Sequence, residues 1–377
     1  MEFSVECRDQ SARAGTISTD HGIIQTPCFM PVGTQGSVKA VSPRELDEVG
    51  SSLILCNTYH LYLRPGTGVI DACGGLHRFV GWDRPILTDS GGYQVFSLSD
   101  LRKIGEDGVE FRSHVDGSLH SFTPEGVVDI QRHLGSDVMM VLDECTPHPC
   151  TFEYAEKSNN LTLRWAERSR SRFAKTASVH GRRQSLFAIV QGSVYPEIRE
   201  HSARVLIDME FEGYAIGGLA VGEPAEEMYR IASLCTEILP EEKPRYLMGV
   251  GTPANLLEGI ERGVDMFDCV LPTRNGRNSM FFTRTGTISI TNAQYKSDTA
   301  PVDSGCGCYT CTHFTRAYLR HLFQVKEMLA PRLATLHNLF FYQRLMRGAR
   351  EAIRQGTFLT WKQEQLGLLV QEVPAYS

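Results

Sequence analysis

Eight short apolar segments constrain the fold of this chain more than any other feature of its sequence. They cover residues 26–32, 52–57, 85–89, 138–143, 186–191, 214–218, 245–249 and 266–270. Most are continuously apolar, which is typical of strands buried on both faces of a parallel sheet. Helical patterns lie between many of them, one starting at Thr123 and Pro124 and stopping at Gly135, another covering residues 253–263. We therefore predict an α/β fold, a (β/α)8 barrel.

Polar residues that could bind a ligand or take part in a reaction lie at the ends of these predicted strands. Asn57, Asp89, Asp143 and Gln191 each close one segment. Barrel enzymes assemble their sites at this end of the strands, so we expect one pocket there. The last segment carries Asp268 among apolar neighbours, and burial of an unpaired carboxylate costs several kcal/mol. We interpret Asp268 as a reactive group; the alternative is a structural aspartate held by backbone amides.

Two stretches depart from the barrel pattern. Residues 108–122 predict a hairpin that turns on Asp116 and Gly117, inserted after the third strand. Residues 280–290 predict a second hairpin, which leads into a cysteine cluster. We predict a single catalytic domain over residues 1–377, with a zinc-binding subdomain over residues 278–345 inside it.

The cysteine cluster has the composition and spacing of a metal site. The candidate ligands are Cys306, Cys308, Cys311 and His337. Three thiolates and one imidazole form a closed tetrahedral set, which is structural rather than catalytic, so we predict one structural Zn²⁺ per chain. His313 and His321 are rival fourth ligands. Three unrelated buried cysteines would be the alternative to a metal site.

Composition and charge narrow the class of protein. The 377 residues are 42% hydrophobic and 22% charged, and no apolar run is long enough to span a membrane. The N-terminus lacks the apolar core of a signal peptide, and 11 cysteines in such a chain favour metal or reactive roles over disulfides, so we expect a cytoplasmic protein. The net charge of −6 excludes a generally basic nucleic-acid binder. Basic stretches at 164–183 and 316–354 could still track phosphates, or could be ordinary solvated helix faces.

Several motifs occur in an order that points to one family. They are TDSGGYQVF (88–96), LDEC (142–145), VQGS (190–193), IGGLAVGE (216–223), LMGVG (247–251), MFDCVLPTRNGR (266–277) and the Cys₃His spacing. Together they resemble bacterial tRNA-guanine transglycosylases over nearly the whole chain, with one departure at Ser193, where the family pattern has glycine. The resemblance implies an irregular (β/α)8 barrel with a zinc subdomain. It also implies exchange of the wobble guanine (position 34) of U-G-U anticodon tRNAs for a 7-deazaguanine, a step in queuosine biosynthesis.

The resemblance assigns two catalytic carboxylates. Base exchange at C1′ with net retention needs two displacements, and hence a nucleophile and an acid/base group. Asp268 matches the nucleophile, which holds the tRNA covalently while the bases exchange. Asp89 matches the general acid/base; a turn or cap residue is its alternative interpretation. Asn57 and Ser90 are expected to hold these two carboxylates in place.

The resemblance also assigns a base pocket. Asp143 matches the acceptor of the N1–H and N2–H donors of guanine, and Gln191 and Gly218 suit its O6. The other implied pocket residues are Tyr93, Met248, Ser90, Leu219, Glu223, Cys145 and Val221. Tyr93 and Met248 would sandwich the ring, and the Leu219 carbonyl, supported by Glu223, would accept from an exocyclic ammonium. Cys145 and Val221 are typical of bacterial members, which take 7-aminomethyl-7-deazaguanine (preQ1).

The implied partners are tRNA, a small 7-deazaguanine base and a second copy of the chain, with no membrane. Arg274 and Arg277 match residues that read the uridines beside the target guanine, and Lys39 is expected to contact phosphate. Apolar residues 339–342 could belong to the dimer interface or to the core of the zinc subdomain. Two rival functions stay open, a non-catalytic tRNA-binding partner subunit and a barrel glycoside hydrolase that uses water as acceptor.

Overall fold

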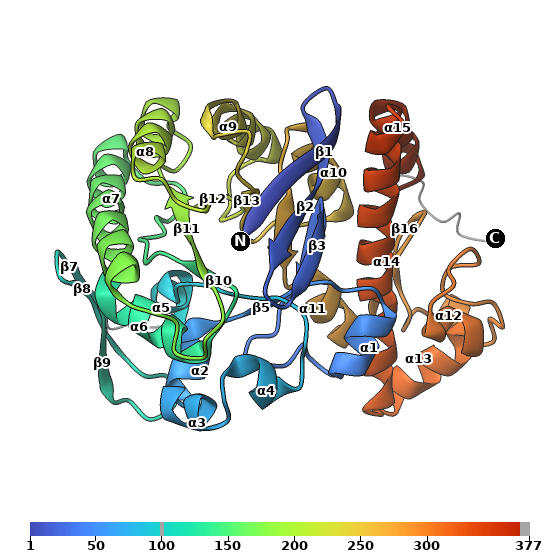
Figure 1. The fold of residues 1–377 in the computed structure, drawn as a ribbon. Helices are drawn as coiled ribbons and strands as arrows, with labels where there is room; N and C mark the ends of the chain where they lie inside the picture. The colour runs from blue at the N-terminus through green and yellow to red at the C-terminus, as the bar shows by residue number, and fades with distance from the viewer. Residues whose placement is uncertain (99–101, 370–377) are drawn as a thin grey trace.

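An eight-stranded parallel sheet forms the centre of the molecule (Figure 1), whose computed structural model describes residues 1–98 and 102–369. Its strands, in spatial order, are β4 (Cys28–Pro31), β14 (Met266–Cys269), β13 (Arg245–Leu247), β12 (Gly213–Ile216), β11 (Ser185–Val190), β10 (Val138–Met140), β6 (Ile86–Thr88) and β5 (Ile54–Cys56). A parallel bridge between Val32 and Leu55, and a hydrogen bond of 2.6 Å from the Gly33 N–H to the Leu55 carbonyl, join the two edge strands. The sheet is therefore closed into a barrel, as predicted, and each of the eight predicted segments overlaps one of its strands.

Helices follow most of the barrel strands and surround them. The longer ones are α6 (Pro124–Leu134), α7 (Phe152–Lys175), α8 (Pro196–Asp208), α9 (Ala225–Ile238), α10 (Pro253–Glu261), α14 (Leu329–Arg354) and α15 (Phe358–Leu369). The shorter ones are α1 (Pro43–Glu48), α2 (Thr58–Leu63), α3 (Thr67–Ala72), α4 (Leu76–Val80), α5 (Gly92–Leu98) and α11 (Leu271–Arg277). The predicted signals set the ends of α6, since the Thr123 hydroxyl accepts from the Gly126 N–H at 3.0 Å and Gly135 ends the helix in the left-handed conformation. Among the residues that the structure describes, no helix is both long and apolar enough to cross a bilayer.

A three-stranded antiparallel sheet, which we did not predict, packs against the amino-terminal end of the barrel. Its strands are β1 (Glu2–Asp9), β2 (Ala12–Thr19) and β3 (Gly22–Thr26). A buried ion pair attaches it, because Arg13 Nε donates to Asp265 Oδ1 at 2.8 Å and the same guanidinium donates to the Glu241 and Lys243 carbonyls. Asp265 directly precedes β14, so this sheet covers the barrel end that faces away from the predicted site. Residues along β1 alternate between exposed and half-buried, which leaves no continuous apolar run.

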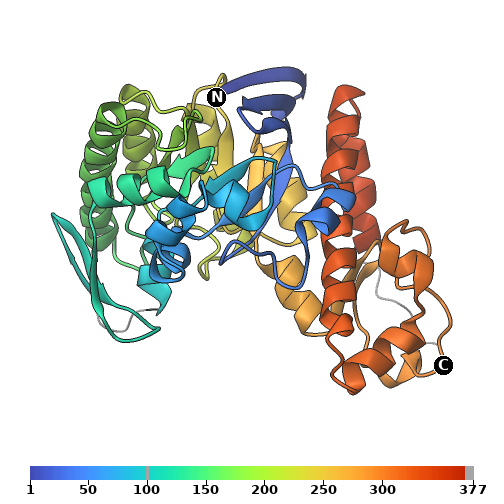
Figure 2. The same cartoon turned by 60° about the horizontal axis from the view of Figure 1, so that its bottom comes forward.

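Two smaller sheets contain the predicted hairpins. The first comprises β7 (Arg102–Gly105), β8 (Gly108–Arg112) and β9 (Leu119–Phe122), and the second comprises β15 (Met280–Thr283) and β16 (Gly286–Ser289). After β16 come a 3₁₀ turn (Ala293–Tyr295), α12 (Tyr309–His313) and α13 (Arg316–Gln324). The first sheet and the α12–α13 segment lie at opposite sides of the molecule (Figure 2).

Helix α14 contributes to two hydrophobic cores. Near its start, Ala330 and Leu333 pack in a small core that also contains residues of β15, α12 and α13. Further along, Leu339 and Tyr342 are fully buried in the core of the barrel. Residues 339–342, for which a dimer interface and the zinc-side core were both open, therefore contribute chiefly to the barrel core.

Candidate active site and metal centre

A cavity of about 570 Å³ opens at the carboxyl ends of the barrel strands. The predicted residues that line it are Asn57, Asp89, Ser90, Tyr93, Asp143, Cys145, Gln191, Gly218, Leu219, Val221, Met248, Asp268 and Arg274. Glu223, Arg277 and Lys39 are not part of the lining. Residues far apart in the sequence meet here because all parallel strands of a closed barrel end at the same face.

Asp268 lies on β14 and is held through one of its two oxygens. The Tyr246 hydroxyl donates to Oδ1 at 2.5 Å, and the Gly249 N–H donates to the same atom at 2.8 Å. Burial raises the pKa of Asp268, and these two hydrogen bonds act against that shift. Burial and the adjacent carboxylate raise the pKa of Tyr246 well above its ordinary value, so its hydroxyl stays a donor. Both contacts fall on Oδ1, which leaves Oδ2 available to attack an electrophile in the cavity.

Asp89 follows β6 and accepts hydrogen bonds on both oxygens. The Asn57 amide donates to Oδ2, as expected, and the Thr58 N–H donates to Oδ1 at 2.9 Å. Burial nevertheless raises the pKa of Asp89 to about 6, and the charge of Asp268 adds to that shift. A carboxyl group that titrates near neutral pH can both give and accept a proton, so Asp89 is suited to acid/base work.

Asp143 follows β10 and is held from two neighbouring strand ends. The Ser90 hydroxyl donates to Oδ1 at 3.0 Å, and Gln191 Nε2 donates to Oδ2 at 2.7 Å. The expectation that Ser90 holds one of the two carboxylates Asp268 and Asp89 is therefore wrong, because its hydroxyl contacts Asp143. The strand before Ser90 is β6, which adjoins β10 in the sheet, whereas β14 lies across the barrel. Asp143 thus presents a carboxylate that can accept adjacent N–H donors from a ligand.

Replacement of Asp143 by asparagine is expected to stabilise the fold at pH 7.5. Burial raises the pKa of Asp143 to about 6, above the value of about 3.9 for an unfolded chain. The folded protein therefore binds the proton more tightly, and its stability falls as pH rises from 4 to 6 and stays lower above that range. Asp143→Asn should raise the free energy of unfolding by about 1–3 kcal/mol at pH 7.5 and by much less at pH 4. Chemical denaturation at both pH values measures this, and an equal change at the two would contradict it.

The loop after β12 presents backbone groups near the cavity. Gly218 has a φ of 64°, and a Cβ there would lie 2.3 Å from Gln191 Oε1, so glycine is required. Glu223 accepts a hydrogen bond from the Ala220 N–H. In a trans peptide the carbonyl points opposite to the N–H, so the Leu219 carbonyl points away from Glu223. Glu223 therefore orients this loop from the side of the peptide that faces away from the cavity.

The remaining predicted lining residues lie at different depths. Tyr93 is 53% exposed, Met248 is half-buried and Cys145 is buried. Burial raises the pKa of Cys145 to about 12, so its sulfur stays a neutral thiol next to the cavity. An exposed ring and a half-buried thioether are both accessible to a flat ligand.

Three residues at this site were missed from the sequence. Tyr246 holds Asp268 and Thr58 holds Asp89. His60 lines the cavity with a pKa that burial lowers to about 4, so it is neutral near pH 7. Only the position of Thr58, directly after Asn57 at a predicted strand end, gave a usable signal. The role of Tyr246 depends on the register between β13 and β14, which the sequence does not reveal.

The predicted metal ligands come together at the small core beside α14. They are Cys306, Cys308, Cys311 and His337. The three sulfur atoms lie 3.8, 3.4 and 3.3 Å from His337 Nδ1. Ligand atoms around a tetrahedral Zn²⁺ would be separated by about 3.6 Å, so this set fits such an ion. His337 Nε2 lies 2.7 Å from the Phe282 carbonyl, a contact that leaves Nδ1 facing the thiols.

The rival ligands are placed elsewhere. His313 Nδ1 lies 2.9 Å from the Tyr309 carbonyl, and neither His313 nor His321 belongs to the cluster. The cluster is also connected to its surroundings. Asn338, next to His337, accepts from the Phe282 N–H at 2.9 Å and donates to the Pro272 carbonyl at 3.0 Å.

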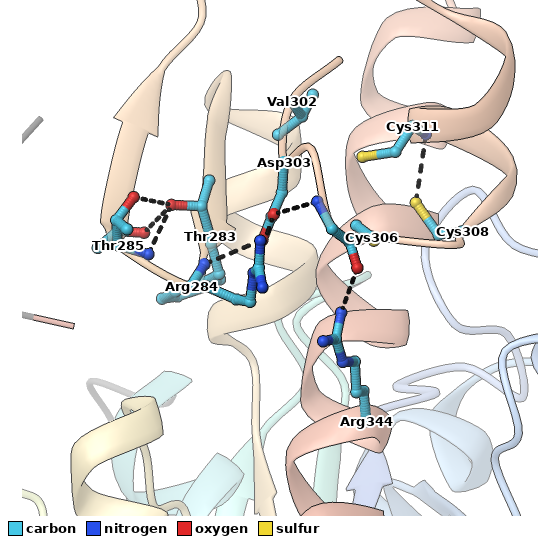
Figure 3. A network of polar contacts seen from close by, with 12 residues as sticks. Thr283, Arg284, Thr285, Val302, Asp303, Cys306, Cys308, Cys311 and Arg344 are labelled. Carbon is cyan, nitrogen blue, oxygen red and sulfur yellow. Dashed lines mark hydrogen bonds and ion pairs between the residues drawn. The ribbon is translucent and has the colours of Figure 1, made fainter. Parts of the chain in front are cut away.

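Polar contacts hold the loop that carries Cys306 (Figure 3). The Asp303 carboxylate accepts from the Arg284 N–H at 3.0 Å, from Arg284 Nε at 3.2 Å and from the Gly305 N–H at 3.1 Å. Arg344 of α14 donates to the Gly305 carbonyl at 2.7 Å. These contacts preorganise the knuckle independently of the metal.

A second group of possible ligands lies at the other end of the barrel. His21 Nδ1 is 2.7 Å and His77 Nε2 is 3.1 Å from the Asp137 carboxylate, and the two rings are stacked with centroids 3.6 Å apart. The Ile86 N–H also donates to Asp137 at 2.8 Å. Since both carboxylate oxygens are already engaged and the rings are nearly parallel, this group is a satisfied hydrogen-bond network.

The basic stretches are largely engaged in contacts within the chain. In the first, ion pairs join Arg164 to Glu106, Arg168 to Glu125, Arg170 to Glu212, Arg172 to Asp129 and Arg183 to Asp20. In the second, they join Arg316 to Asp298, Arg332 to Glu45 and Arg354 to Glu6. By contrast, Arg274 and Arg277 of α11 and Lys39 are exposed.

A closed parallel barrel with carboxylates gathered in one cavity at its strand ends has the architecture of a barrel enzyme. A family model described as queuine tRNA-ribosyltransferase matches residues 7–368. The chain belongs to the queuine tRNA-ribosyltransferase family. It is accordingly an enzyme, a pentosyltransferase of the tRNA-guanine transglycosylase type.

Curated relatives named queuine tRNA-ribosyltransferase are similar to the chain over almost their full length. That of Thermoanaerobacter pseudethanolicus is 58% identical over 354 residues, which cover 94% of this chain and 93% of the relative. Those of Nitrosomonas eutropha and Desulforamulus reducens are 55% and 54% identical, and the matches cover 95% and 97% of this chain and 98% of each relative.

Proposed function

We propose that this enzyme exchanges the guanine at position 34 of U-G-U anticodon tRNAs for preQ1, a step in queuosine biosynthesis. The observation that carries the proposal is the pair of carboxylates in one cavity, Asp268 with a free oxygen and Asp89 with a pKa of about 6. Retention at C1′ needs one nucleophile and one acid/base group, and these two residues supply them.

The reaction consists of two displacements at C1′. In the first, Asp268 Oδ2 attacks C1′, the bond to N9 of guanine breaks, and Asp89 gives a proton to the departing base. In the second, Asp89 takes the proton from N9 of the incoming base, N9 attacks C1′, and the bond to Asp268 breaks. Tyr246 and the Gly249 N–H orient Asp268 through its other oxygen in both steps. The target nucleotide must be extruded from its stack to reach the cavity.

Base recognition follows from the donors and acceptors around the cavity. Asp143 accepts from N1–H and N2–H, and Gln191 and the Gly218 N–H donate to O6. The Leu219 carbonyl accepts from the aminomethyl ammonium, with its peptide oriented by Glu223. Tyr93 and Met248 sandwich the ring, Ser90 supports Asp143, and Cys145 lines the pocket beside the base.

Val221 is expected to limit the size of the 7-substituent. Its half-buried side chain lines the cavity, so Val221→Gly enlarges the pocket where a bulkier group would lie. The variant should incorporate queuine at least about tenfold faster than the wild type, because removing a clash of this size is worth about 1–3 kcal/mol. Incorporation of queuine and preQ1 into the same tRNA measures this, and an unchanged ratio would show that another residue sets the limit.

The remaining parts serve tRNA binding and stability. Arg274 and Arg277 contact the uridines beside the target guanine, and Lys39 contacts a phosphate of the tRNA. The enzyme works as a homodimer, in which one subunit catalyses the exchange while the other helps to hold the tRNA. One Zn²⁺ per subunit, held by the Cys₃His set, stabilises a subdomain over residues 278–345 within a single catalytic domain over residues 1–377. The enzyme works in the cytoplasm.

The test of this function uses radiolabelled guanine and an unmodified tRNA with a U-G-U anticodon loop. The wild type should incorporate label at position 34, and a chase with unlabelled preQ1 should remove it irreversibly. Release of guanine without incorporation would instead favour a hydrolase. Tight tRNA binding without any exchange would favour a non-catalytic partner subunit. Label that resists the preQ1 chase would contradict preQ1 as the incoming base.

A further inference from the structure

Arg199 of α8 is a buried cation that the reaction described above does not use. Its side chain is 0% exposed, and no carboxylate of the described residues lies within ion-pair distance of it, the charge of Glu223 acting on it only from further away. Burial lowers the pKa of Arg199, although an arginine remains charged near neutral pH. An unpaired buried charge is costly unless hydrogen bonds compensate for it. Its position therefore calls for a reason beyond packing.

The compensation comes from three backbone carbonyls on two different strand ends. Arg199 Nε donates to the Ser193 carbonyl at 2.8 Å, and its terminal nitrogens donate to the Val190 carbonyl at 2.7 Å and to the Gly218 carbonyl at 3.4 Å. Val190 ends β11 and Gly218 follows β12. One rigid planar guanidinium thus connects the carboxyl ends of two adjacent strands.

Two of these carbonyls belong to residues with an unusual backbone. Ser193 has a φ of 51° and Gly218 a φ of 64°, both in the left-handed region. Serine rarely adopts this conformation, and it persists only where the surroundings hold it. Ser193 is also the position at which the family pattern has glycine. Arg199 is the contact that holds both residues at once.

The spacing between the two strand ends matters for the cavity. Gln191 lies between Val190 and Ser193, and a Cβ added to Gly218 would approach Gln191 Oε1 to 2.3 Å, so the Gln191 amide lies directly against the Gly218 backbone. Gln191 Nε2 donates one hydrogen to Asp143 at 2.7 Å, which leaves its second hydrogen for a ligand. A shift of either end would misplace the Gln191 amide relative to the Gly218 N–H.

We propose that Arg199 is a positioning residue for base exchange, which fixes the Gln191 amide and the Gly218 N–H at the separation that the O6 oxygen of a purine requires. The inference rests on the proposed function, because it takes these two groups as the O6 donors. Arg199 does not touch the base; it acts through the carbonyls of residues 190, 193 and 218.

The test compares Arg199→Met and Arg199→Lys with a control on the same helix. Arg204→Met removes an exposed arginine that pairs with Glu200 at 2.8 Å. Steady-state exchange gives KM for guanine and KM for tRNA separately, and thermal unfolding reports whether each variant is folded at the assay temperature. Arg199→Met should raise KM for guanine by at least about tenfold and leave KM for tRNA within about twofold, since only the base site is displaced.

Lysine separates the geometry of the guanidinium from its charge. Arg199→Lys keeps the charge but cannot span three carbonyls, so KM for guanine should stay raised by at least about threefold, while Arg204→Met should resemble the wild type. An unchanged KM for guanine in a folded Arg199→Met variant would overturn the inference, as would full rescue by lysine. Equal increases in KM for guanine and KM for tRNA would also overturn the inference, because they would show that Arg199 only stabilises the fold. Absence of exchange in the wild type would instead refute the proposed function.

Discussion

Asp268→Asn is expected to reduce base exchange by at least about 10⁴-fold while tRNA still binds, as loss of a covalent nucleophile does in other enzymes. Asparagine has nearly the same shape and can keep an acceptor for the Tyr246 hydroxyl and the Gly249 N–H, so the cavity should change little. Its amide, however, lacks the anionic oxygen that would attack C1′. The lost rate therefore measures the chemistry of Asp268 rather than its packing.

The measurement has two readouts. Label from guanine entering tRNA gives the rate, and a denaturing gel detects a protein–RNA adduct when tRNA is supplied without free base. The wild type should give both signals and Asp268→Asn neither, while Asp208→Asn, an exposed carboxylate at the end of α8, serves as the matched control. An adduct that persists in Asp268→Asn would assign the nucleophile to another residue.

Cys308→Ala is expected to lose the metal and to lower the free energy of unfolding by more than about 3 kcal/mol, because metal-binding energy is folding energy at a structural site. Cys308 is buried within the small core, and its sulfur both faces His337 Nδ1 and accepts from the Cys311 N–H at 3.4 Å at the start of α12. Removal of this thiol therefore leaves the ligand set incomplete and removes the helix cap.

Metal content and denaturant unfolding, measured on the same samples, test this expectation. Cys73→Ala removes an exposed cysteine and should change neither quantity. Treatment of the wild type with a strong chelator should reproduce the loss of stability. Loss of metal from Cys308→Ala without a change in unfolding would show that the Asp303 and Arg284 contacts alone hold the loop.

The barrel and the cavity at its strand ends were predictable because their signals are local. Continuous apolar runs marked the strands, and the residue that closes each run marked the cavity, as Asn57, Asp89 and Asp143 illustrate. The N-terminal sheet was not predicted because β1 alternates between exposed and half-buried residues. A short alternating segment of this kind gives a weak signal, since one of its faces is only partly covered.

Contacts that depend on the relative placement of distant segments were not predictable. Ser90 holds Asp143 instead of Asp89 or Asp268 because β6 adjoins β10, an order that the sequence does not state. For the arginines of the 164–183 stretch, phosphate contacts and a solvated helix face were both open, yet five of them pair with carboxylates from distant segments. In both cases the side chain was visible in the sequence and its partner was not.

Two adjacent residues of α14 connect the cysteine–histidine cluster to the cavity at the strand ends. His337 faces the thiols, and Asn338 beside it holds the Pro272 carbonyl in α11, the helix that carries Arg274. Asp268 lies on the strand that leads into α11. Under the proposed function, a cell short of zinc would loosen the common anchor of Arg274, which is assigned to tRNA binding, and of Asp268, which is assigned as the nucleophile, so metal supply would limit RNA modification.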